Sequence, residues 1–347
     1  MLITGGKIEL LPLLVLLMFS TQIYGPILAI LSQLTSLFHL ETVTNRMRTL
    51  LTTPAMEGED KDVSKYDIEL KNVTFGYNQD DVIKDVSFSI PAGSVTALVG
   101  PSGSGKSTLC SLIPRFYEVT SGRILLDGED VRKYTLHSLR GHIGVVQQDV
   151  HLFSGSVIDN IRYGRPTATD AEVVEAAKRA GAHDFIMGLE NGYHTYVGEH
   201  GFKLSGGQKQ RISIARALMK HAPILILDDS VSAVDTKTER TILDNLKKRE
   251  GLTTILIAHR ISTVEQMDKI VFVEDGEVHA VGKHEDLYRT CTAYRKMVDL
   301  QKLEEEAGES RNAQLLSDSL GRRDHRRDFH PADCGRVCSE RWKKKKP

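Results

Sequence analysis

A glycine-rich stretch ending in Lys106, Ser107 and Thr108 constrains this chain more than any other part of its sequence. It fits the phosphate-binding pattern G-x-x-x-x-G-K-[ST] with no mismatch. Its residues are Gly100, Pro101, Ser102, Gly103, Ser104, Gly105, Lys106, Ser107 and Thr108. Residues 95–99 predict a short buried strand before it, and residues 108–113 predict the start of a helix after it. This context favours a phosphate cradle over the alternative, an ordinary glycine-rich turn.

The chemistry of this loop predicts phosphate binding together with Mg²⁺. Glycines let backbone N–H groups turn inward, and the start of the following helix adds partial positive charge. Lys106 is expected to reach the β- and γ-phosphates of a nucleotide, and the Ser107 hydroxyl is expected to hold Mg²⁺.

A second acidic group is expected wherever such a loop uses Mg²⁺, and Asp228 supplies it. Residues 224–227 are apolar and predict a buried strand, so the acid lies at the carboxyl end of a strand, where α/β proteins bind ligands. Asp228 is therefore expected to polarise Mg²⁺ through water. The alternative is a buried strand that ends in a solvated acidic turn.

The composition sets looser limits. A length of 347 residues suits one large domain with extensions or two modest domains, and 40% hydrophobic with 26% charged residues is ordinary for a folded protein. The net charge of −1 gives no indication of nucleic acid as the main partner. Four cysteines in a chain of this length do not make a disulfide framework, and a reducing, cytosolic compartment fits them.

Residues 10–31 contain no charged residue, and their length matches the roughly 20 residues that a membrane-spanning helix needs. Pro12 and Pro26 are tolerated near the ends of such a span. A signal peptide is one alternative, but Lys7 is the only basic residue before the apolar core and the cleavage site is poor. A buried helix of a soluble protein is the other. The length and uniform hydrophobicity favour the membrane helix.

The next segment, residues 32–51, is amphipathic and predicts a continuation of the same helix into the cytosol. Arg46 and Arg48 place this side of the span in the cytoplasm under the positive-inside rule. Residues 52–55 contain a proline and are expected to end the helix. A charged, solvated linker follows over residues 57–65.

A globular domain is expected to begin near Tyr66, and it reads as a mainly parallel α/β core with helices between most strands. Strands are predicted at residues 68–75, 86–90, 95–99, 124–127, 143–146, 224–227, 254–258 and 270–273.

The polar end of the chain, from residue 304 onward, is expected to be a disordered tail. Cysteines and histidines within it match no zinc template, which favours chance spacing over metal binding; they are Cys334, Cys338, His325 and His330. The lysine run at 343–346 is interpreted as solvated rather than bound to anionic lipid.

A second glycine pair opens another predicted helix. Its stretch consists of Leu204, Ser205, Gly206, Gly207 and Gln208. Adjacent glycines at the start of a helix form a second possible anion site within one chain. Since one phosphate site cannot easily use two cradles, the motif predicts that two copies face each other.

With these two motifs, the sequence from residue 68 to about residue 300 resembles the ATP-binding cassette (ABC) family. The resemblance implies a P-loop NTPase core with an antiparallel β subdomain and an inserted helical subdomain, preceded by one transmembrane helix. It implies that two nucleotide-binding domains sandwich two ATP molecules, each held by one phosphate loop and the partner's 204–208 motif. The expected domains are residues 1–55 for the last transmembrane helix, 56–66 for a linker, 67–301 for the nucleotide-binding domain and 302–347 for the tail.

The resemblance also implies roles for single residues. Tyr77 is expected to stack on adenine, although it could merely cap a strand end. Gln148 is expected to sense Mg²⁺ and the membrane domain, and it is preferred over Gln147 because of its spacing to Leu152. Residues 232–235 match the loop that communicates across the dimer, through Asp235. His259 matches the switch histidine near the γ-phosphate.

Two features indicate an exporter. Residues 196–201 look like the loop of exporter-type cassettes that touches the partner's membrane domain. Residues 10–55 look like the last membrane helix of a half-transporter, and the lack of five further helices in this sequence suggests a truncated chain or a gene fragment.

One departure from the family pattern lies at Asp229, where most active members carry a catalytic glutamate. A carboxylate that is one methylene shorter would sit farther from the attacking water, and this favours a heterodimer with unequal sites.

The leading hypothesis is an ATPase that drives export across the cell membrane, with its nucleotide-binding domain in the cytoplasm. Its cofactors are ATP and Mg²⁺, and its partners are a second half-transporter and membrane lipid, with no nucleic acid. The alternatives are a soluble cassette ATPase without transport and an inert nucleotide-binding fragment.

Overall fold

The structure is a computed structural model that describes residues 10–52, 56, 58–78, 80–198, 204–230, 234–258 and 260–303. The chain divides into two compact units, Met1–Met56 and Glu57–Pro347. Each unit is described by itself.

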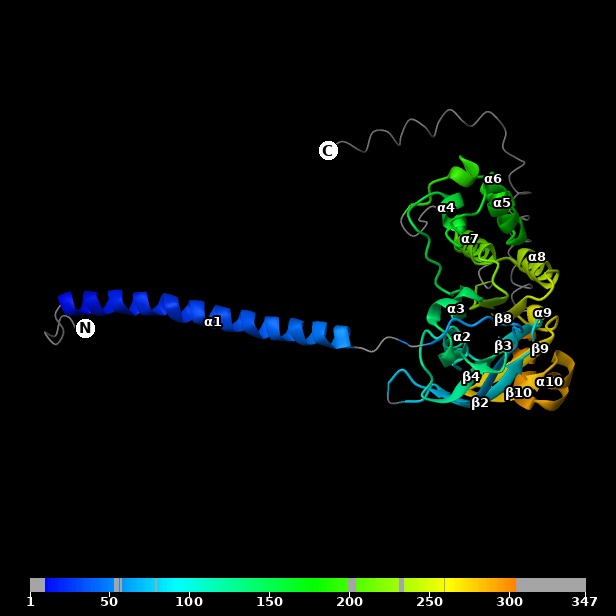
Figure 1. The fold of residues 1–347 in the computed structure, drawn as a ribbon, viewed down its shortest axis with the longest axis horizontal. Helices are drawn as coiled ribbons and strands as arrows, with labels where there is room; N and C mark the ends of the chain where they lie inside the picture. The colour runs from blue at the N-terminus through cyan, green and yellow to red at the C-terminus, as the bar shows by residue number, and fades with distance from the viewer. Residues whose placement is uncertain are drawn as a thin grey trace, which may run out of the picture. The chain divides into compact units, whose positions relative to one another are not determined.

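The first unit is the single helix α1, Leu10–Thr52 (Figure 1). Its 43 residues correspond to roughly 65 Å at 1.5 Å per residue, about twice the thickness of a bilayer's hydrocarbon core. Length and composition make it a candidate membrane span, although a signal sequence near an N-terminus passes the same test. The hydroxyls of Ser20 and Thr21 donate to carbonyls three residues earlier, so these polar groups are satisfied inside the helix. The predicted continuous helix is confirmed, and it ends at Thr52, the first of the residues 52–55 that were expected to end it.

The second unit is built around a mainly parallel, six-stranded sheet. Its strands are β3 (Val95–Val99), β6 (Ile143–Val146), β7 (Ile224–Leu227), β8 (Thr253–Ile257), β9 (Lys269–Glu274) and β10 (Glu277–Gly282). Their order in the sheet is β10-β9-β3-β8-β7-β6. Only the β9–β10 pair is antiparallel, so the carboxyl ends of the other strands all meet at one edge.

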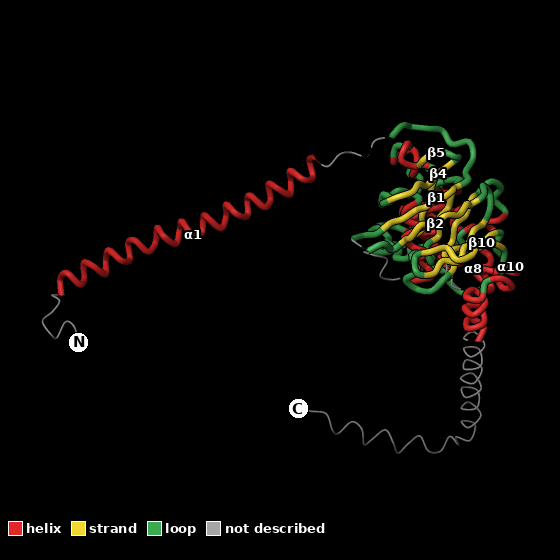
Figure 2. The backbone as a smooth tube through the Cα atoms, turned by 90° about the horizontal axis from the view of Figure 1, so that it is seen from below, coloured by secondary structure: helices red, strands yellow, loops and turns green. Residues whose placement is uncertain are grey.

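A second sheet is antiparallel and contains four strands. They are β1 (Ile68–Phe75), β2 (Ile83–Ile90), β4 (Ser121–Leu126) and β5 (Glu129–Asp130), in the order β2-β1-β4-β5 (Figure 2). The backbone N–H of Lys84 donates to the carbonyl of Gly276 at 2.9 Å, which joins this sheet to the β9–β10 hairpin. Strand β1 carries register shifts against both of its neighbours.

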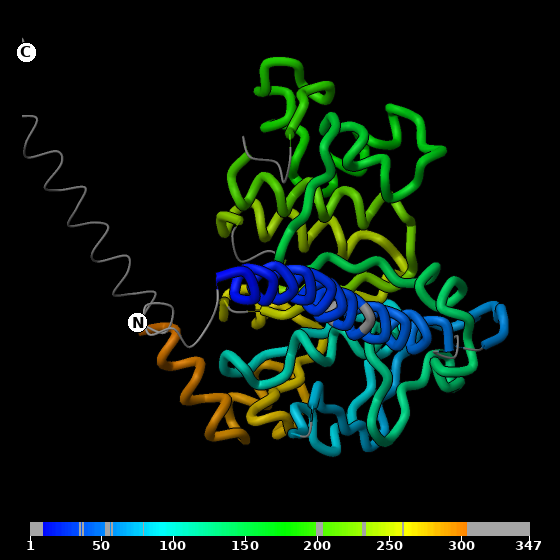
Figure 3. The backbone as a smooth tube through the Cα atoms, turned by 90° about the vertical axis from the view of Figure 1, so that its left-hand side faces the viewer, coloured from blue at the N-terminus to red at the C-terminus, as the bar shows by residue number. Residues whose placement is uncertain are grey.

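Helices cover both faces of the parallel sheet. They are α2 (Lys106–Leu112), α3 (Leu136–Gly141), α4 (Val157–Arg162), α5 (Asp170–Arg179), α6 (His183–Met187), α7 (Gly206–Met219), α8 (Thr236–Lys247), α9 (Ile261–Val264) and α10 (His284–Thr290), with 3-10 turns η1 (Val131–Lys133) and η2 (Gly192–His194). Helices α4 to α7 are inserted between β6 and β7, and they gather at one end of this unit (Figures 1 and 3).

The parallel sheet separates two apolar cores because successive side chains on a strand face opposite sides. In β3, Val95, Ala97 and Val99 belong to the core shared with the inserted helices. Leu98 belongs instead to the core shared with α2 and the antiparallel sheet. A strand buried on both faces reads as a continuous apolar run, which explains why the sequence located these strands well.

The predicted strands agree closely with the structure. Those at 68–75, 95–99, 143–146 and 224–227 have the observed bounds. The others are shifted or shortened by one to three residues, and β5 and β10 were not predicted. The helix after the phosphate-binding stretch begins at Lys106, earlier than predicted, because Gly105 adopts the left-handed conformation that caps it. The mainly parallel α/β core is confirmed.

Glu239 of α8 is a buried charge within this unit, with a residue exposure of 2%. It accepts a hydrogen bond from Arg260 Nη1 at 2.6 Å and another from Thr263 Oγ1 at 2.5 Å. The same Arg260 nitrogen lies 3.1 Å from the carbonyl oxygen of Val234. This carboxylate therefore joins α8 to the two loops that lead into α8 and α9.

We predict that Glu239→Gln lowers the free energy of unfolding by about 1–3 kcal/mol, because the amide cannot accept from Arg260 and Thr263 as two carboxylate oxygens do. Urea unfolding of the chain in detergent, followed by circular dichroism, measures the change. Glu250→Gln changes an exposed glutamate shortly after α8, and this matched control should unfold as the parent does. Equal midpoints for both variants would contradict a stabilising role for Glu239.

Candidate functional site

The phosphate-binding stretch forms a loop between the carboxyl end of β3 and the start of α2. Gly100 has a φ of +152°, and a Cβ atom there would lie 1.9 Å from the carbonyl oxygen of Val273. Gly105 has a φ of +97° and is the N-cap residue of α2. Backbone geometry therefore requires glycine at Gly100 and favours it at Gly105.

Lys106 is folded against its own loop and is 6% exposed. Its Nζ donates to the carbonyl oxygens of Gly100 at 2.9 Å and Pro101 at 2.6 Å. Burial lowers the pKa of Lys106, while the negative charges of Asp229 and Asp228 raise it. One ammonium group and two carboxylates thus act on one another across this edge of the sheet.

The Ser107 hydroxyl donates a hydrogen bond to Asp228 Oδ1 at 2.8 Å. This contact brings the start of α2 to the residue that follows β7, two elements 121 positions apart in the sequence. Hydroxyl and carboxylate oxygens are ligands that suit Mg²⁺. Within the described part of the chain, no group of three or more His, Cys, Asp or Glu residues could hold a metal. A Mg²⁺ ion here would therefore need phosphate and water oxygens as well.

A pocket of about 300 Å³ lies over the phosphate-binding loop. Its lining consists of Val82, Ser102, Gly103, Gly105, Lys106, Ser107, Thr108, Gln148, Asp229 and Ile257. The structure thus brings Gln148 and Asp229 to the loop, as the sequence predicted. Gln147 does not line this pocket but two neighbouring ones.

Gln148 and Asp229 face each other across this pocket. Gln148 Nε2 donates to Asp229 Oδ2 at 3.4 Å. Asp229 has a φ of +47°, a left-handed backbone conformation that aspartate tolerates better than most residues. The residue after β7 therefore turns sharply while its side chain remains beside the phosphate loop.

Tyr77 lies beside the start of α2. Its hydroxyl is 3.1 Å from Thr108 Oγ1, and its ring makes edge contacts with Phe75 and Tyr117. The residue is 51% exposed. An exposed ring next to Thr108 is placed where a base attached to a nucleotide on this loop can reach it.

The motif at residues 204–208 begins helix α7. Ser205 Oγ accepts from the backbone N–H of Gln208, and Gln208 Oε1 accepts from the backbone N–H of Ser205, which is a complete capping box. A Cβ atom on Gly206 would meet nothing within 4 Å. None of residues 204–208 lines the pocket over the phosphate loop. The structure of one chain therefore does not bring the two motifs together.

Of the remaining predicted residues, Asp235 is described by the structure and His259 is not. Asp235 is the N-cap of α8, where its side chain accepts from the backbone N–H of Thr238 at 3.0 Å. His259, residues 232 and 233, and residues 199–201 of the exporter-type loop lie outside the described residues, as does the tail from residue 304.

Glu239 is the residue of this region that the sequence analysis missed. Glu239 accepts a hydrogen bond from Arg260, the residue that follows His259. Arg260 also donates to the carbonyl of Val234, the residue that precedes Asp235. A signal was present, since Ile242, Leu243 and Leu246 follow at the spacing of one buried helix face. A charge on that face must be paired inside the protein.

Comparison with known proteins assigns residues 83–232 to the family described as ABC transporter. Multidrug export ATP-binding/permease proteins of Staphylococcus aureus strains NCTC 8325 and COL are each 52% identical over 241 residues, which is 68% of this chain and 41% of the relative. Among solved structures, a bacterial Atm1-family ABC exporter with ATP bound is 42% identical with a TM-score of 0.72, over 76% of this chain and 47% of that chain.

The chain spans less than half of the length of these relatives. The parallel core, the antiparallel sheet and the inserted helices of the structure are the parts of the fold that the resemblance implied. Sequence and fold agree in this assignment, since the phosphate-binding loop and the motif at 204–208 both lie within the matched residues. Residues 83–232 therefore form a domain of the ABC transporter family.

Proposed function

We propose that this chain binds and hydrolyses ATP with Mg²⁺ and that hydrolysis drives export across the cell membrane, as one subunit of a dimer of half-transporters. The observation that carries the proposal is the pocket that joins Lys106 and Ser107 to Gln148 and Asp229, together with the Ser107–Asp228 hydrogen bond. The similarity to exporter proteins over the same domain supports it.

The residues of the pocket divide the work of phosphoryl transfer. Lys106 binds the β- and γ-phosphates, and Ser107 and Asp228 would hold Mg²⁺, which would neutralise charge on the phosphate oxygens. Gln148 orients the attacking water, and Asp229 occupies the position of the general base, where its short side chain limits transfer of the water's proton. Tyr77 stacks on adenine, and His259 contacts the γ-phosphate side.

Completion of the site requires a second chain. The capped glycine motif at 204–208 carries unshielded backbone at Gly206 but lies away from the chain's own phosphate loop. A partner in head-to-tail orientation would bring its motif to this loop, and Asp235 would lie at the same interface. ATP is thereby buried between two chains, which explains why one chain carries two anion-binding motifs.

A groove lined in part by Gln147 is a candidate docking surface for the membrane helices. It has a volume of about 580 Å³, and its wall includes Phe153, Tyr163 and Arg216. Phe153 and Tyr163 stack with ring centroids 4.5 Å apart while both are exposed, and Arg216 lies over the Phe153 ring. Exposed aromatic surface of this kind suits a protein partner. We infer that the cytoplasmic end of membrane helices docks here.

The membrane localisation rests on α1. Its apolar stretch is long enough to span a bilayer, and Arg46 and Arg48 lie on the side of the nucleotide-binding domain in the sequence. This orientation puts the domain in the cytoplasm, where ATP is available, and brings lipid to the exposed apolar side chains of α1.

We predict that Lys106→Ala weakens ATP binding by about tenfold to a hundredfold, because charge-assisted hydrogen bonds to phosphate are lost. A fluorescent ATP analogue titrated into the chain in detergent measures the affinity. Lys178→Ala, an exposed lysine on α5, is the matched control. Parent affinity in a folded Lys106→Ala variant would remove the phosphate loop from the proposed site.

We predict that Gly207→Asp abolishes ATP-dependent dimerisation and leaves ATP binding by the single chain intact. The added carboxylate would repel the partner's γ-phosphate. Light scattering of the variant with ATP in excess measures the molecular mass, and Gly141→Asp, at an exposed glycine with open space around its Cβ, is the control. A Gly207→Asp dimer with ATP would rule out the sandwich arrangement.

We predict that Asp229→Glu raises the ATPase rate of this chain's own site, while Asp229→Asn changes little. A longer carboxylate reaches the attacking water better, and general-base positioning is worth about 10²–10⁴-fold in rate. Phosphate release by the purified chain measures the rate, and His259→Ala is a control that slows any active site. A fast parent enzyme that Asp229→Asn inactivates would favour a homodimer with equal sites over the heterodimer.

A further inference from the structure

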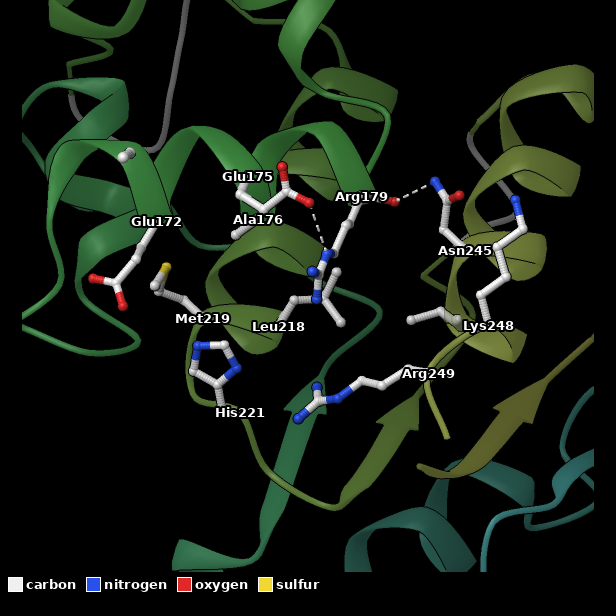
Figure 4. A pocket seen from close by; sticks show the side chains of 12 residues that line it. Glu172, Glu175, Ala176, Arg179, Leu218, Met219, His221, Asn245, Lys248 and Arg249 are labelled. Atoms are coloured by element: carbon white, nitrogen blue, oxygen red, sulfur yellow. Dashed lines mark hydrogen bonds and ion pairs between the residues drawn. The ribbon is translucent and has the colours of Figure 1, made fainter. Parts of the chain in front are cut away.

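A pocket of about 730 Å³ lies outside the nucleotide site, between α5, the end of α7 and the end of α8 (Figure 4). None of its lining residues belongs to the phosphate loop or to residues 204–208. Its volume lies within the range of small-molecule sites, roughly 300–1,000 Å³. The hydrogen bond from Asn245 Nδ2 to the Arg179 carbonyl, at 3.2 Å, closes one side between α8 and α5.

Basic side chains from three elements converge on this pocket. Figure 4 shows Arg179 from α5, His221 from the turn after α7 and Arg249 from the turn after α8 directed toward one space. Apolar side chains, including Leu218 and Met219, form the neighbouring wall. The pocket thus combines a cationic end with an apolar surface.

The carboxylates at its rim are already engaged. Glu172 pairs with Arg165 and caps α5 through Thr169, and these contacts lower the pKa of Glu172 to about 2. Glu175 pairs with Arg179 at 3.2 Å. That pair is exposed on both sides, so it is worth little and Arg179 can exchange it for a ligand.

Arg249 has no such counterion. Among the described residues, none forms an ion pair with it. Its pKa is lowered by burial and by the positive charge of Arg179. The pKa of His221 is lowered by burial and by Arg165, Arg249 and Arg179, against Glu172 alone. The Nε of Arg165 is also buried without a hydrogen-bond partner within the described part of the chain. Arg249 therefore adds a positive charge to this pocket that the carboxylates at its rim, paired with Arg165 and Arg179, do not balance.

We propose that this pocket binds a small organic phosphate, with the phosphate on Arg249 and Arg179 and the apolar part against Leu218 and Met219. A planar guanidinium matches two phosphate oxygens, and two such groups suit a dianion. The bound ligand would contact α5 of the inserted helices and α8 of the core at once. The site is independent of the proposed function, because no residue of the nucleotide pocket takes part in it.

The test uses the full chain in detergent with ¹³C-methyl methionine and ¹⁵N histidine labels, and phenyl phosphate as the probe. The methyl signal of Met219 should shift saturably, and the pKa of His221 should rise because the bound dianion offsets the surrounding positive charges. Both signals report on this pocket and not on phosphate bound to the loop at Lys106. The Met219→Leu and His221→Gln variants assign them.

Variants separate the charge from the apolar wall. Arg249→Ala should weaken binding of phenyl phosphate about tenfold or more, while Arg240→Ala, an exposed arginine of α8, should leave it unchanged. Arg249→Lys keeps the charge and should weaken binding less than alanine does.

Two further probes complete the experiment. Inorganic phosphate should bind more weakly than phenyl phosphate, and phenol should not shift the pKa of His221. Equal affinity for inorganic phosphate would overturn the apolar part of the proposal. Binding that is insensitive to Arg249→Ala, or an absence of any shift at Met219 and His221, would overturn the site itself.

Discussion

The hydrogen bond between Ser107 and Asp228 is the contact on which the candidate site depends. It exists because β3 and β7 are parallel strands of one sheet on either side of β8, so the loop after β3 and the acid after β7 emerge at the same edge. A reversed β7 would carry Asp228 to the opposite edge. The three loop glycines with positive φ then fix the loop so that Lys106 lies under it rather than in solvent.

The insertion of α4 to α7 between β6 and β7 also determines which parts of the site lie close together in one chain. These helices separate Gln148, which follows β6, from Asp228 in the sequence, yet the sheet brings the two residues together, since both line a second pocket of about 340 Å³ that is separate from the one over the phosphate loop. The same insertion carries the motif at 204–208 away from the chain's own loop. Under the proposed function, this separation is the reason that a partner chain is needed to bring the motif to the loop.

Buried apolar runs explain how much of this could be predicted. Strands β3 and β7 are buried along their whole length and β6 at all but one residue, and their apolar sequences predicted the observed bounds. Strand β10 alternates between exposed and half-buried residues, and β5 has only two residues, so neither has a comparable signal. The pocket residues were found through motifs, whereas Glu239 needed its partners Arg260 and Thr263, which follow it by more than twenty positions. Side-chain pairs between residues so far apart in the chain cannot be predicted from a single sequence.

Asp229 shows where chemistry and backbone geometry compete for one position. Its left-handed backbone gives a reason for aspartate that has nothing to do with catalysis, since short polar side chains tolerate this conformation best. Its oxygen nevertheless lies 3.4 Å from Gln148 Nε2, inside the pocket that holds Lys106 and Ser107. A longer side chain at this position would gain reach toward a water on the phosphate loop and lose part of that backbone preference. The backbone preference for aspartate over a longer side chain is worth at most about 1–2 kcal/mol. General-base catalysis changes a rate by about 10²–10⁴-fold, which corresponds to a larger free energy. Under the proposed function, reach rather than strain is therefore the property of Asp229 that we expect to limit turnover.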